Sequence, residues 1–258
     1  ALAACRGLRL PVVISERNQP DRPGLGRARR LARRLTYGWA AGIVMQTEAL
    51  AAWARARFKV PVHVIPNPVP INEAPRRREE DLENHAARLV VAIGRLTQQK
   101  GFDLLIESFG QIAPKYPDWR LIIYGDGPQR RELTLMAQGD LLQGRVALPG
   151  LTKDVAVALS QASIFVLPSR FEGFPNVLLE ALSLGVPAIA TECPGASAEI
   201  LRDGTYGLLV PPDDVQAMKA ALETMMTQPE LRKAFAAKGP EAVHSYAIAQ
   251  VSGRWLDL

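Results

Sequence analysis

Residues 89–112 read LVVAIGRLTQQKGFDLLIESFGQI. The run Leu89–Ile93 is apolar throughout and predicts a buried strand, and apolar residues at helical spacing predict a helix over Phe102–Ile112. Between them lies the loop Gly94–Gly101. Because the strand is a continuous apolar run and does not alternate with polar residues, it is typical of a parallel sheet that is covered on both faces.

The same order of strand, Gly or Pro turn and helix recurs as far as about residue 225. Such alternation predicts a doubly wound α/β domain, in which ligands bind where loops leave the carboxyl ends of the strands. We predict further strands at 121–124, 146–148, 164–167, 188–190 and 208–210, and helices at 131–137, 155–161, 177–183, 196–201 and 215–226.

Residues 1–65 resemble the end of a similar unit. The predicted strands are 11–14, 43–46 and 62–65, with helices at 31–41 and 49–57. Three strands are too few for a complete doubly wound domain, so this Rossmann-like domain is expected to lack its opening half. A stiff Pro66-Asn67-Pro68 segment and the charged run 76–83 indicate a linker. The predicted division is a first domain over 1–65, a linker over 66–88, a doubly wound domain over 89–240 and a terminal helix over 241–258.

Composition and charge exclude several classes of protein. The chain has 258 residues, of which 48% are hydrophobic and 22% charged, which excludes collagen-like, disordered and disulfide-scaffold proteins. The two cysteines lie far apart and fit a reducing compartment. The three histidines share no short motif with other ligand types, so no metal site is expected. The longest uncharged stretches, 35–47 and 155–169, are shorter than the ~20 residues of a membrane-spanning helix. We expect a cytoplasmic protein.

The net charge of +5 is unevenly spread. Residues 1–65 carry net +9 and residues 66–258 carry net −4, and the positive charge is densest over Arg27–Arg34. This segment has three interpretations, of which a solvated helix face is the first. Attraction to anionic lipid headgroups is the second. Nucleic-acid binding comes last, because aromatic interleaving and a recognisable module are missing.

The loop Gly94–Gly101 follows a buried strand and opens a helix. Such a loop can present backbone N–H groups to an anion, and Arg95 and Lys100 add two positive charges. The alternative is a strand–helix turn with two solvated cations. The Walker pattern is absent, so this is not a Walker phosphate loop.

The turn Gly125–Pro128 follows the next strand. Two glycines, on either side of Asp126, allow close backbone approach to a ligand. Taken by itself, the segment reads more simply as a tight turn.

The segment Ser169–Glu180 is the most informative. Glu172 falls in the loop and Glu180 about one turn into the following helix, so both can point into one cleft. The N–H groups of Phe174, Asn176 and Val177 near the helix start suit an anion. An exposed helix carboxylate is the alternative for Glu180, but its apolar surroundings would make an unpaired carboxylate costly.

Together these segments resemble the family 4 glycosyltransferases, which have the GT-B fold and move a sugar from a nucleotide donor with retention at the anomeric carbon. The resemblance covers about residue 60 to the end and also includes Gly185-Val186-Pro187. It implies an α/β protein of GT-B type, with a doubly wound donor-binding domain beside an incomplete Rossmann-like domain. The segments 15–20 and 65–69 resemble a bacterial subset that makes capsular, exopolysaccharide or lipopolysaccharide glycans.

The resemblance implies roles for individual residues. Arg95 and Lys100 would neutralise the donor diphosphate, Glu172 would contact the donor sugar, and these three would be the catalytic residues. Glu180 would accept hydrogen bonds from the ribose, and loop residues near Gly125 and 151–153 would frame the base. The implied donor-binding residues are Gly94, Gly125, Asp126, Gly127, Leu151, Thr152, Gly173, Phe174, Pro175, Asn176, Val177 and Glu180. No metal or other cofactor is implied, and a UDP-sugar is favoured over a GDP-sugar.

The implied partners are the nucleotide-sugar donor and a glycan or lipid-linked acceptor, with an anionic membrane surface at Arg27–Arg34 and no nucleic acid. The enzyme would be a hexosyltransferase or N-acetylhexosaminyltransferase, peripheral on the inner face of the plasma membrane. Members often carry a His where Ser15-Glu16-Arg17 stands here, and an early Gly-rich loop that this chain does not have before residue 7. Its terminal helix, with Tyr246 and Trp255, would cross back to the first domain. Two other functions stay open: a nucleotide-sugar-binding module that is inactive as this chain, and a GT-B nucleotide-sugar epimerase.

Overall fold

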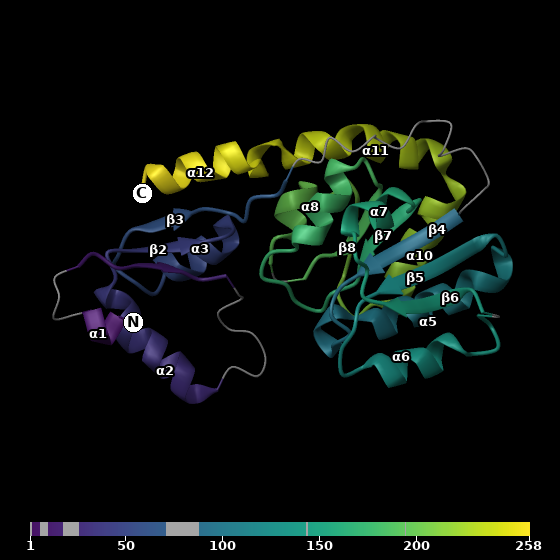
Figure 1. Cartoon of the computed structure of the whole chain (residues 1–258), viewed down its shortest axis with the longest axis horizontal. Coiled ribbons are helices and arrows are strands. Elements are labelled where there is room, and N and C mark those ends of the chain that lie inside the picture. The colour runs from purple at the N-terminus through teal and green to yellow at the C-terminus, as the bar shows by residue number, and fades with distance from the viewer. Residues whose placement is uncertain (1, 6–9, 18–25, 71–87, 143, 194) are drawn as a thin grey trace.

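The computed structural model describes residues 2–5, 10–17, 26–70, 88–142, 144–193 and 195–258. The strands form two separate parallel sheets, one of three strands and one of six. Figure 1 shows the two sheets side by side, with the C-terminal helix lying along the smaller one. The predicted linker 66–88 lies mostly outside the described residues, because only 66–70 and 88 are described.

The larger sheet has the strand order β6-β5-β4-β7-β8-β9, and all of its neighbours are parallel. From β4 the chain adds β5 and β6 on one side, and then returns to the other side of β4 with β7. The order therefore reverses between β4 and β7, which confirms the predicted doubly wound fold. The strands are β4 (Arg88–Ile93), β5 (Trp119–Tyr124), β6 (Val146–Gly150), β7 (Ile164–Leu167), β8 (Ala188–Thr191) and β9 (Leu208–Val210).

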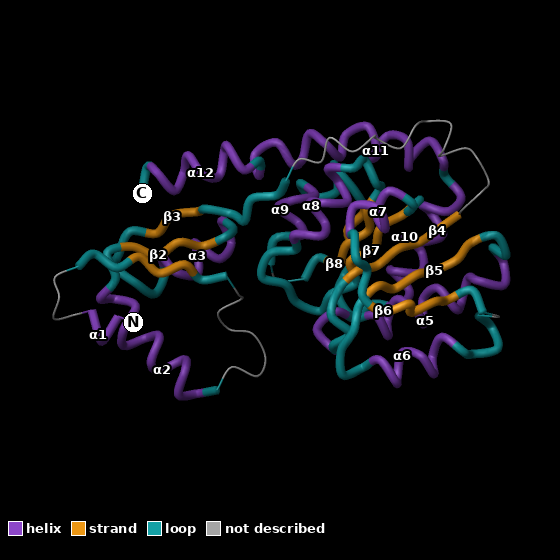
Figure 2. The backbone as a smooth tube through the Cα atoms, viewed as in Figure 1, coloured by secondary structure: helices purple, strands orange, loops and turns teal. Residues whose placement is uncertain are grey.

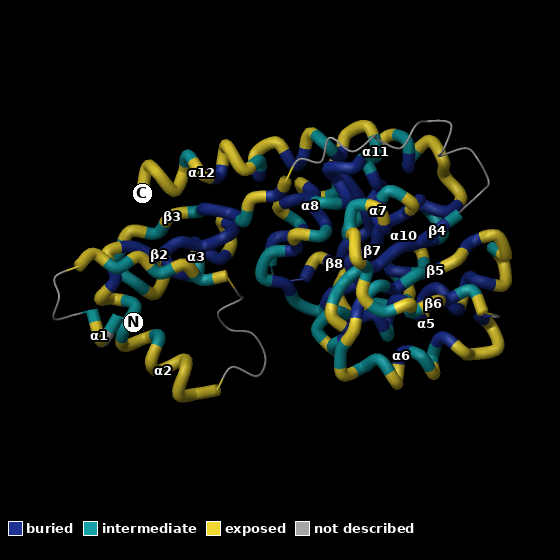
Figure 3. Tube along the Cα trace, in the orientation of Figure 1, coloured by how far each residue is buried: buried dark blue, intermediate teal, exposed yellow. Residues whose placement is uncertain are grey.

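Helices cover both faces of this sheet (Figure 2). Alternate residues of β4 contribute to the two hydrophobic clusters: Val90 and Ala92 pack on one face, and Leu89 and Val91 on the other. The first face is covered by α5 (Phe102–Ile112), α6 (Arg130–Ala137) and α10 (Val215–Thr227), and the second by α7 (Val155–Ser160), α8 (Asn176–Ser183) and α9 (Ser197–Leu201). Figure 3 shows that the buried residues concentrate in and around this sheet.

Side-chain caps set where several helices begin. Asp154 accepts a hydrogen bond from Val157 N at 3.0 Å at the start of α7. Asp214 accepts one from Ala217 N at 2.9 Å at the start of α10. Each carboxylate satisfies an amide that has no partner inside its own helix, and its negative charge also suits the positive end of the helix dipole.

The smaller sheet has the order β1-β2-β3, formed by Val13–Ser15, Gly42–Met45 and Val62–Val64. Its core contains Ile43 and Met45 from β2 and Leu50 and Ala54 from α3 (Glu48–Arg55). A short helix, α1 (Leu2–Cys5), precedes β1.

The basic helix of the first domain starts earlier than the sequence predicted. The expected helix over 31–41 is instead α2 (Arg27–Thr36) followed by a 3₁₀ turn, Tyr37–Trp39. The prediction began at Leu31, but arginine is itself a strong helix former, and the helix begins at Arg27. It ends before Gly38, which is a poor helix residue.

The single terminal helix expected over 241–258 is in fact two helices. The first, α11 (Pro229–Val243), ends in a 3₁₀ turn, His244–Tyr246, and α12 (Ile248–Leu256) follows. The chain is extended at Ala247, where Val69 N donates to Tyr246 O at 2.9 Å. This backbone pairing interrupts the helix.

The last helix, α12, lies over the smaller sheet, where Val251 is buried together with Val44 and Ile65. Tyr246 belongs to the core of the larger domain, where its ring packs 5.8 Å from that of Phe174. Trp255 stays 38% exposed. Val251, and not Trp255, is therefore buried against the first domain. Within the described part of the chain, no helix is both long and apolar enough to cross a membrane.

Candidate active site

A cavity of about 430 Å³ lies at the carboxyl ends of the neighbouring strands β4 and β7, which lead to helices on opposite faces of the sheet. This is the point at which the strand order reverses, and in doubly wound sheets ligands bind there. The cavity is lined mainly by the loops after β4 and β7, with single contributions from elsewhere. Its lining residues are Arg17, Ile93, Gly94, Arg95, Gln99, Lys100, Val155, Glu172, Gly173, Phe174, Pro175, Asn176, Val177 and Glu180.

Hydrogen bonds to backbone carbonyl groups hold the two main loops together. Arg170 N donates to Gln99 O at 2.8 Å, and Gln99 Nε2 donates to Phe171 O at 2.9 Å. Gly101 has a φ of +63°, and a Cβ at this position would collide with the carbonyl oxygen of Pro168. Only glycine allows this approach without strain. The Lys100 loop is therefore fixed directly against the end of β7.

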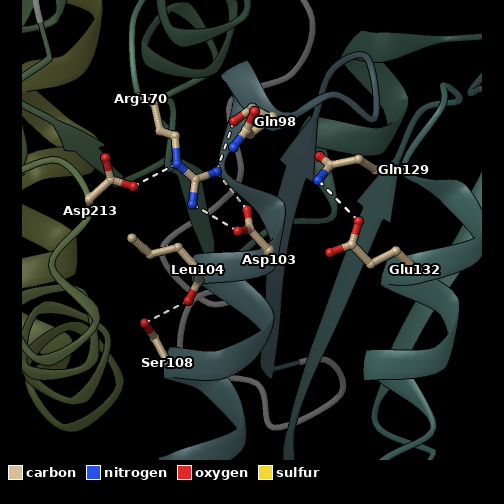
Figure 4. A network of polar contacts seen from close by, with 8 residues as sticks. All are labelled: Gln98, Asp103, Leu104, Ser108, Gln129, Glu132, Arg170 and Asp213. Carbon is tan, nitrogen blue, oxygen red and sulfur yellow. Dashed lines mark hydrogen bonds and ion pairs between the residues drawn. The ribbon is translucent and has the colours of Figure 1, made fainter.

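Arg170 ties these loops to helix α5 (Figure 4). Its guanidinium donates to both carboxylate oxygens of Asp103 at 2.8 Å, to Gln98 O at 2.8 Å and to Asp213 at 2.6 Å. Burial raises the pKa of Asp103, but the hydrogen bonds and charge of Arg170 outweigh it, and the net pKa is lowered. The hydrogen bonds to Asp103 also raise the pKa of Arg170. Such a fork fixes both position and orientation.

Lys100 and Glu172 form a buried ion pair beside the cavity. Lys100 Nζ lies 2.5 Å from Glu172 Oε1, and the side chains are only 15% and 7% exposed. Ser169 Oγ donates to the same oxygen at 2.6 Å. An ammonium group has three donors, so Lys100 can bind Glu172 and still donate to an anion in the cavity.

Arg95 and Glu180, both on the cavity wall, lack charged partners among the described residues. Arg95 is exposed and makes no ion pair there. Glu180, on α8, has no hydrogen bond to its carboxylate in the same part of the chain, and burial raises its pKa. A half-buried carboxylate without a partner is unfavourable for folding. Its position facing a cavity is the arrangement expected of a group that binds a ligand.

The start of α8 supplies backbone donors, but not all of those predicted. No side chain caps this helix, whose N-cap residue is Pro175. Asn176 N already donates to Phe174 O at 3.1 Å and is therefore engaged in the turn. Within the described residues the amides of Phe174 and Val177 have no acceptor. These two N–H groups remain suited to an anion.

Five of the predicted donor-binding residues do not line the cavity: Gly125, Asp126, Gly127, Leu151 and Thr152. The glycine turn instead supports the loop after β4, because Leu96 N donates to Asp126 O at 2.9 Å and Gln129 N donates to Leu96 O at 3.0 Å. A Cβ on Gly125 would collide with Gly94 O. Leu151 is 78% exposed, and Thr152 Oγ1 donates to Asp154 O at 2.8 Å. Their contact with a base stays a prediction.

The first domain contributes residues that sequence reasoning did not assign to the site. Arg17, two residues after β1, lines the cavity. Asn67 links the two domains, since it accepts from Gln46 at 2.5 Å and donates to Asn176 Oδ1 at 3.0 Å. Glu199 accepts from Glu48 N at 3.1 Å. Two features of the sequence could have pointed to these residues: Arg17 follows the end of a strand, and Asn67 lies between two prolines.

Comparison with known proteins identifies the family. Residues 74–242 match the family described as glycosyl transferases group 1. The chain belongs to this family. The resemblance to family 4 glycosyltransferases is confirmed, and the matched residues include every predicted site residue of the larger domain.

Two curated relatives and one solved structure illustrate the relationship. An exopolysaccharide phosphotransferase of Streptomyces coelicolor is 34% identical over 84% of this chain and 23% of its own length. An N-acetylgalactosaminyltransferase of Campylobacter jejuni, named for a diphospho-undecaprenol acceptor, is 28% identical over 64% of this chain and 44% of its own length. This group 1 chain thus spans less than half the length of either relative.

The solved structure is that of HepE from Anabaena in complex with UDP and glucose. It has a TM-score of 0.85 with 20% identity, and the match covers 99% of this chain and 73% of that one. At this identity the likeness shows the fold, and the predicted GT-B fold is confirmed. In the described part of this group 1 chain, no cluster of three or more His, Cys, Asp or Glu could hold a metal ion.

Proposed function

We propose that this chain is a glycosyltransferase that moves a sugar from a nucleotide donor to a glycan or lipid-linked acceptor, with retention of the anomeric configuration, and that its larger domain binds the donor. One observation carries the proposal. The cavity at the reversal of strand order brings Arg95, Lys100 and the uncapped start of α8 to face Glu180. The cavity therefore combines cations that can bind a diphosphate with a carboxylate that can accept hydrogen bonds from hydroxyl groups.

The cations would stabilise the leaving diphosphate. Arg95 can bind a phosphate through two parallel hydrogen bonds, and Lys100 acts as a point charge. The amides of Phe174 and Val177 add two fixed donors. Charges placed where negative charge develops lower the barrier to transfer, which is the task that a metal ion performs in other transferases. We expect transfer to be independent of a divalent metal.

The carboxylates would orient the donor. Glu180 has no partner among the described residues and would accept hydrogen bonds from the ribose hydroxyls. Glu172 is held by Lys100 and Ser169 through Oε1, which leaves Oε2 for a hydroxyl of the donor sugar. The sugar would therefore lie next to the cation that faces the phosphates. No dedicated base is assigned, because the departing phosphate can take the acceptor proton.

The biological setting follows from the relatives. The names of the Streptomyces and Campylobacter proteins refer to exopolysaccharide and to a lipid-diphosphate acceptor. We propose a role in bacterial cell-surface polysaccharide synthesis, with a hexose or N-acetylhexosamine as the transferred sugar. HepE was solved with UDP and glucose, which favours a UDP-sugar over a GDP-sugar. The cytoplasmic face of the plasma membrane is the proposed location, with the basic segment Arg27–Arg34 towards anionic lipid.

A transfer assay tests the proposal. UDP-sugars and GDP-sugars would be supplied to the chain, with and without a lipid-linked or glycan acceptor, and products resolved by mass spectrometry and NMR. We expect an acceptor-dependent α-linked product from an α-linked donor, which chelation does not reduce. A changed sugar formed from donor alone would show an epimerase. Binding of donor without any product would show a binding module and would overturn the proposed activity of this chain.

A further inference from the structure

A second cavity, of about 390 Å³, lies in the first domain between α2 and the end of α3. It shares no lining residue with the proposed donor site. Four arginines, Arg30, Arg33, Arg34 and Arg57, line it together with Trp53, Ala56 and Phe58. None of the lining residues is acidic, so the cavity is strongly cationic.

The charge in this cavity is only partly balanced. Arg33 pairs with Glu16 at 3.0 Å, and Arg57 lies over the ring of Trp53 at 4.7 Å. Arg30 and Arg34, by contrast, are exposed and make no ion pair with any residue that the structure describes. They are four positions apart and therefore neighbours on the helix surface. Two guanidinium groups side by side repel each other unless an anion lies between them.

Helix α2 is poorly stabilised by its own sequence. Arginines occupy its first turn, that turn contains no acidic residue, and Gly26 provides no side-chain cap. Positive charge at this end opposes the helix dipole. The helix also has no fully buried residue (Figure 3). A bound polyanion would remove this repulsion, so the charge pattern favours an anionic ligand over plain solvent.

The remaining wall is apolar and aromatic. Trp53 and Phe58 pack edge to face with ring centroids 6.0 Å apart and form one side of the cavity. On the same helix as the arginines, Leu31 and Leu35 are 58% and 59% exposed. A cationic pocket with an aromatic wall and exposed leucines nearby matches a ligand that has both a phosphate head and a hydrocarbon part.

We propose that this cavity binds the phosphate or diphosphate head of a lipid phosphate, with Arg30 and Arg34 as its main ligands and the Trp53–Phe58 wall beside its first hydrocarbon groups. If the chain is a glycosyltransferase as proposed above, the ligand is the carrier end of the acceptor. A membrane phospholipid headgroup has the same chemistry. The binding itself requires no transfer activity.

The test compares two double variants of the whole chain. R30A/R34A removes two charges from the cavity, whereas R27A/R29A removes two charges from the same helix at positions that do not line it. Calorimetric titrations would use farnesyl diphosphate and inorganic pyrophosphate, and sedimentation would use phosphatidylglycerol or phosphatidylcholine vesicles. Each protein would also be titrated with UDP and with inorganic pyrophosphate, so that the affinity that UDP gains over pyrophosphate from its uridine part reports on the donor site.

We expect R30A/R34A to bind farnesyl diphosphate at least about tenfold more weakly than the wild type, with R27A/R29A changed less than threefold. The affinity that UDP gains over pyrophosphate should be equal in all three, so a failed donor site would not be mistaken for a failed lipid-phosphate site. The same loss with phosphatidylglycerol vesicles alone would assign the cavity to a phospholipid headgroup. If both variants lost the same affinity for farnesyl diphosphate, the total charge of the helix would explain the binding, and the proposal would be overturned. Pyrophosphate binding as tight as farnesyl diphosphate would overturn the lipid part.

Discussion

Lys100 Nζ and Glu172 Oε1 lie 2.5 Å apart in a nearly closed position, whereas the equally short pair Lys115–Glu223 lies on the surface. Removing one partner of a buried pair leaves the other charge unpaired, at a cost of about 3–5 kcal/mol. We predict that Lys100→Ala lowers the free energy of unfolding by about this amount and abolishes transfer. Chemical denaturation and the transfer assay measure the two effects.

The matched control is Lys115→Ala, which should change neither stability nor transfer appreciably because water screens that pair. Adding Glu172→Gln to Lys100→Ala removes the unpaired charge and should recover part of the lost stability without restoring transfer. If the double variant were active, Lys100 would have a structural role only. If Lys100→Ala were as stable as Lys115→Ala, the burial of the pair would be irrelevant.

Glu180 should favour donor binding at the expense of folding stability. Burial raises its pKa above the ordinary value of 4.5, so the folded protein holds this proton more tightly than the unfolded chain. Stability therefore falls as pH rises from 4.5 through the raised pKa. We predict that Glu180→Gln raises the Tm at pH 7.5 and that the gain vanishes below about pH 4. UDP affinity should fall by roughly 10–100-fold. A Tm gain that persists at pH 4 would show that charge burial is not its cause.

Arg170 is a positioning residue for the Lys100 loop. Arg170→Lys keeps the charge, but its three donors cannot replace the four hydrogen bonds that the planar guanidinium makes to Asp103, Gln98 O and Asp213. We predict a loss of about 1.5–3 kcal/mol in unfolding free energy and weaker UDP binding. Asp103→Asn tests the same contact. Because Arg170 lowers the pKa of Asp103 below its ordinary 3.8, the stability that this carboxylate contributes is present above pH 3.8 and is lost as pH falls through the lowered pKa. A pH-independent difference between Asp103→Asn and the wild type would contradict this account.

Gly101 sets the distance between the two loops. Gly101→Ala places a Cβ against Pro168 O in a left-handed conformation, and we predict a loss of about 1–3 kcal/mol by denaturant titration. Gly253→Ala, inside α12 with nothing within 4 Å of the new methyl group, should instead gain about 0.5–1 kcal/mol. Similar responses at both positions would mean that the close approach of Gly101 does not constrain the loop.

The helices and strands of the larger domain could be predicted from the sequence because their apolar residues follow the spacing of a buried strand or of a helix. The helix predicted over Phe102–Ile112 has these bounds in the structure, since its apolar residues recur at helical spacing and Gly101 precedes it. Arg95, Lys100, Glu172 and Glu180 come together because parallel strands deliver their loops to one edge.

Contacts between distant segments could not be predicted in the same way. The interruption after Tyr246 depends on pairing with Val69, and no local signal marks it. The supporting role of Gly125 depends on the backbone of Gly94, 31 residues earlier in the chain. The Arg30–Arg34 cavity also needs Trp53 from α3 and Phe58 from the segment after it, so the run of arginines by itself predicted only a basic helix face. In each case tertiary packing decides the role of the residue.

Amide hydrogen–deuterium exchange with and without UDP tests the central claim most directly, because it locates the bound nucleotide. Slower exchange is expected in residues 94–101, in the loop after β4, and in residues 173–180, which run from the loop after β7 into α8. At a UDP concentration near the wild-type Kd, Glu180→Gln should lose most of this protection. Unchanged exchange in α12 serves as the internal control. Protection confined to other segments, with both loops unchanged at saturating UDP, would contradict the assignment of this cavity as the donor site.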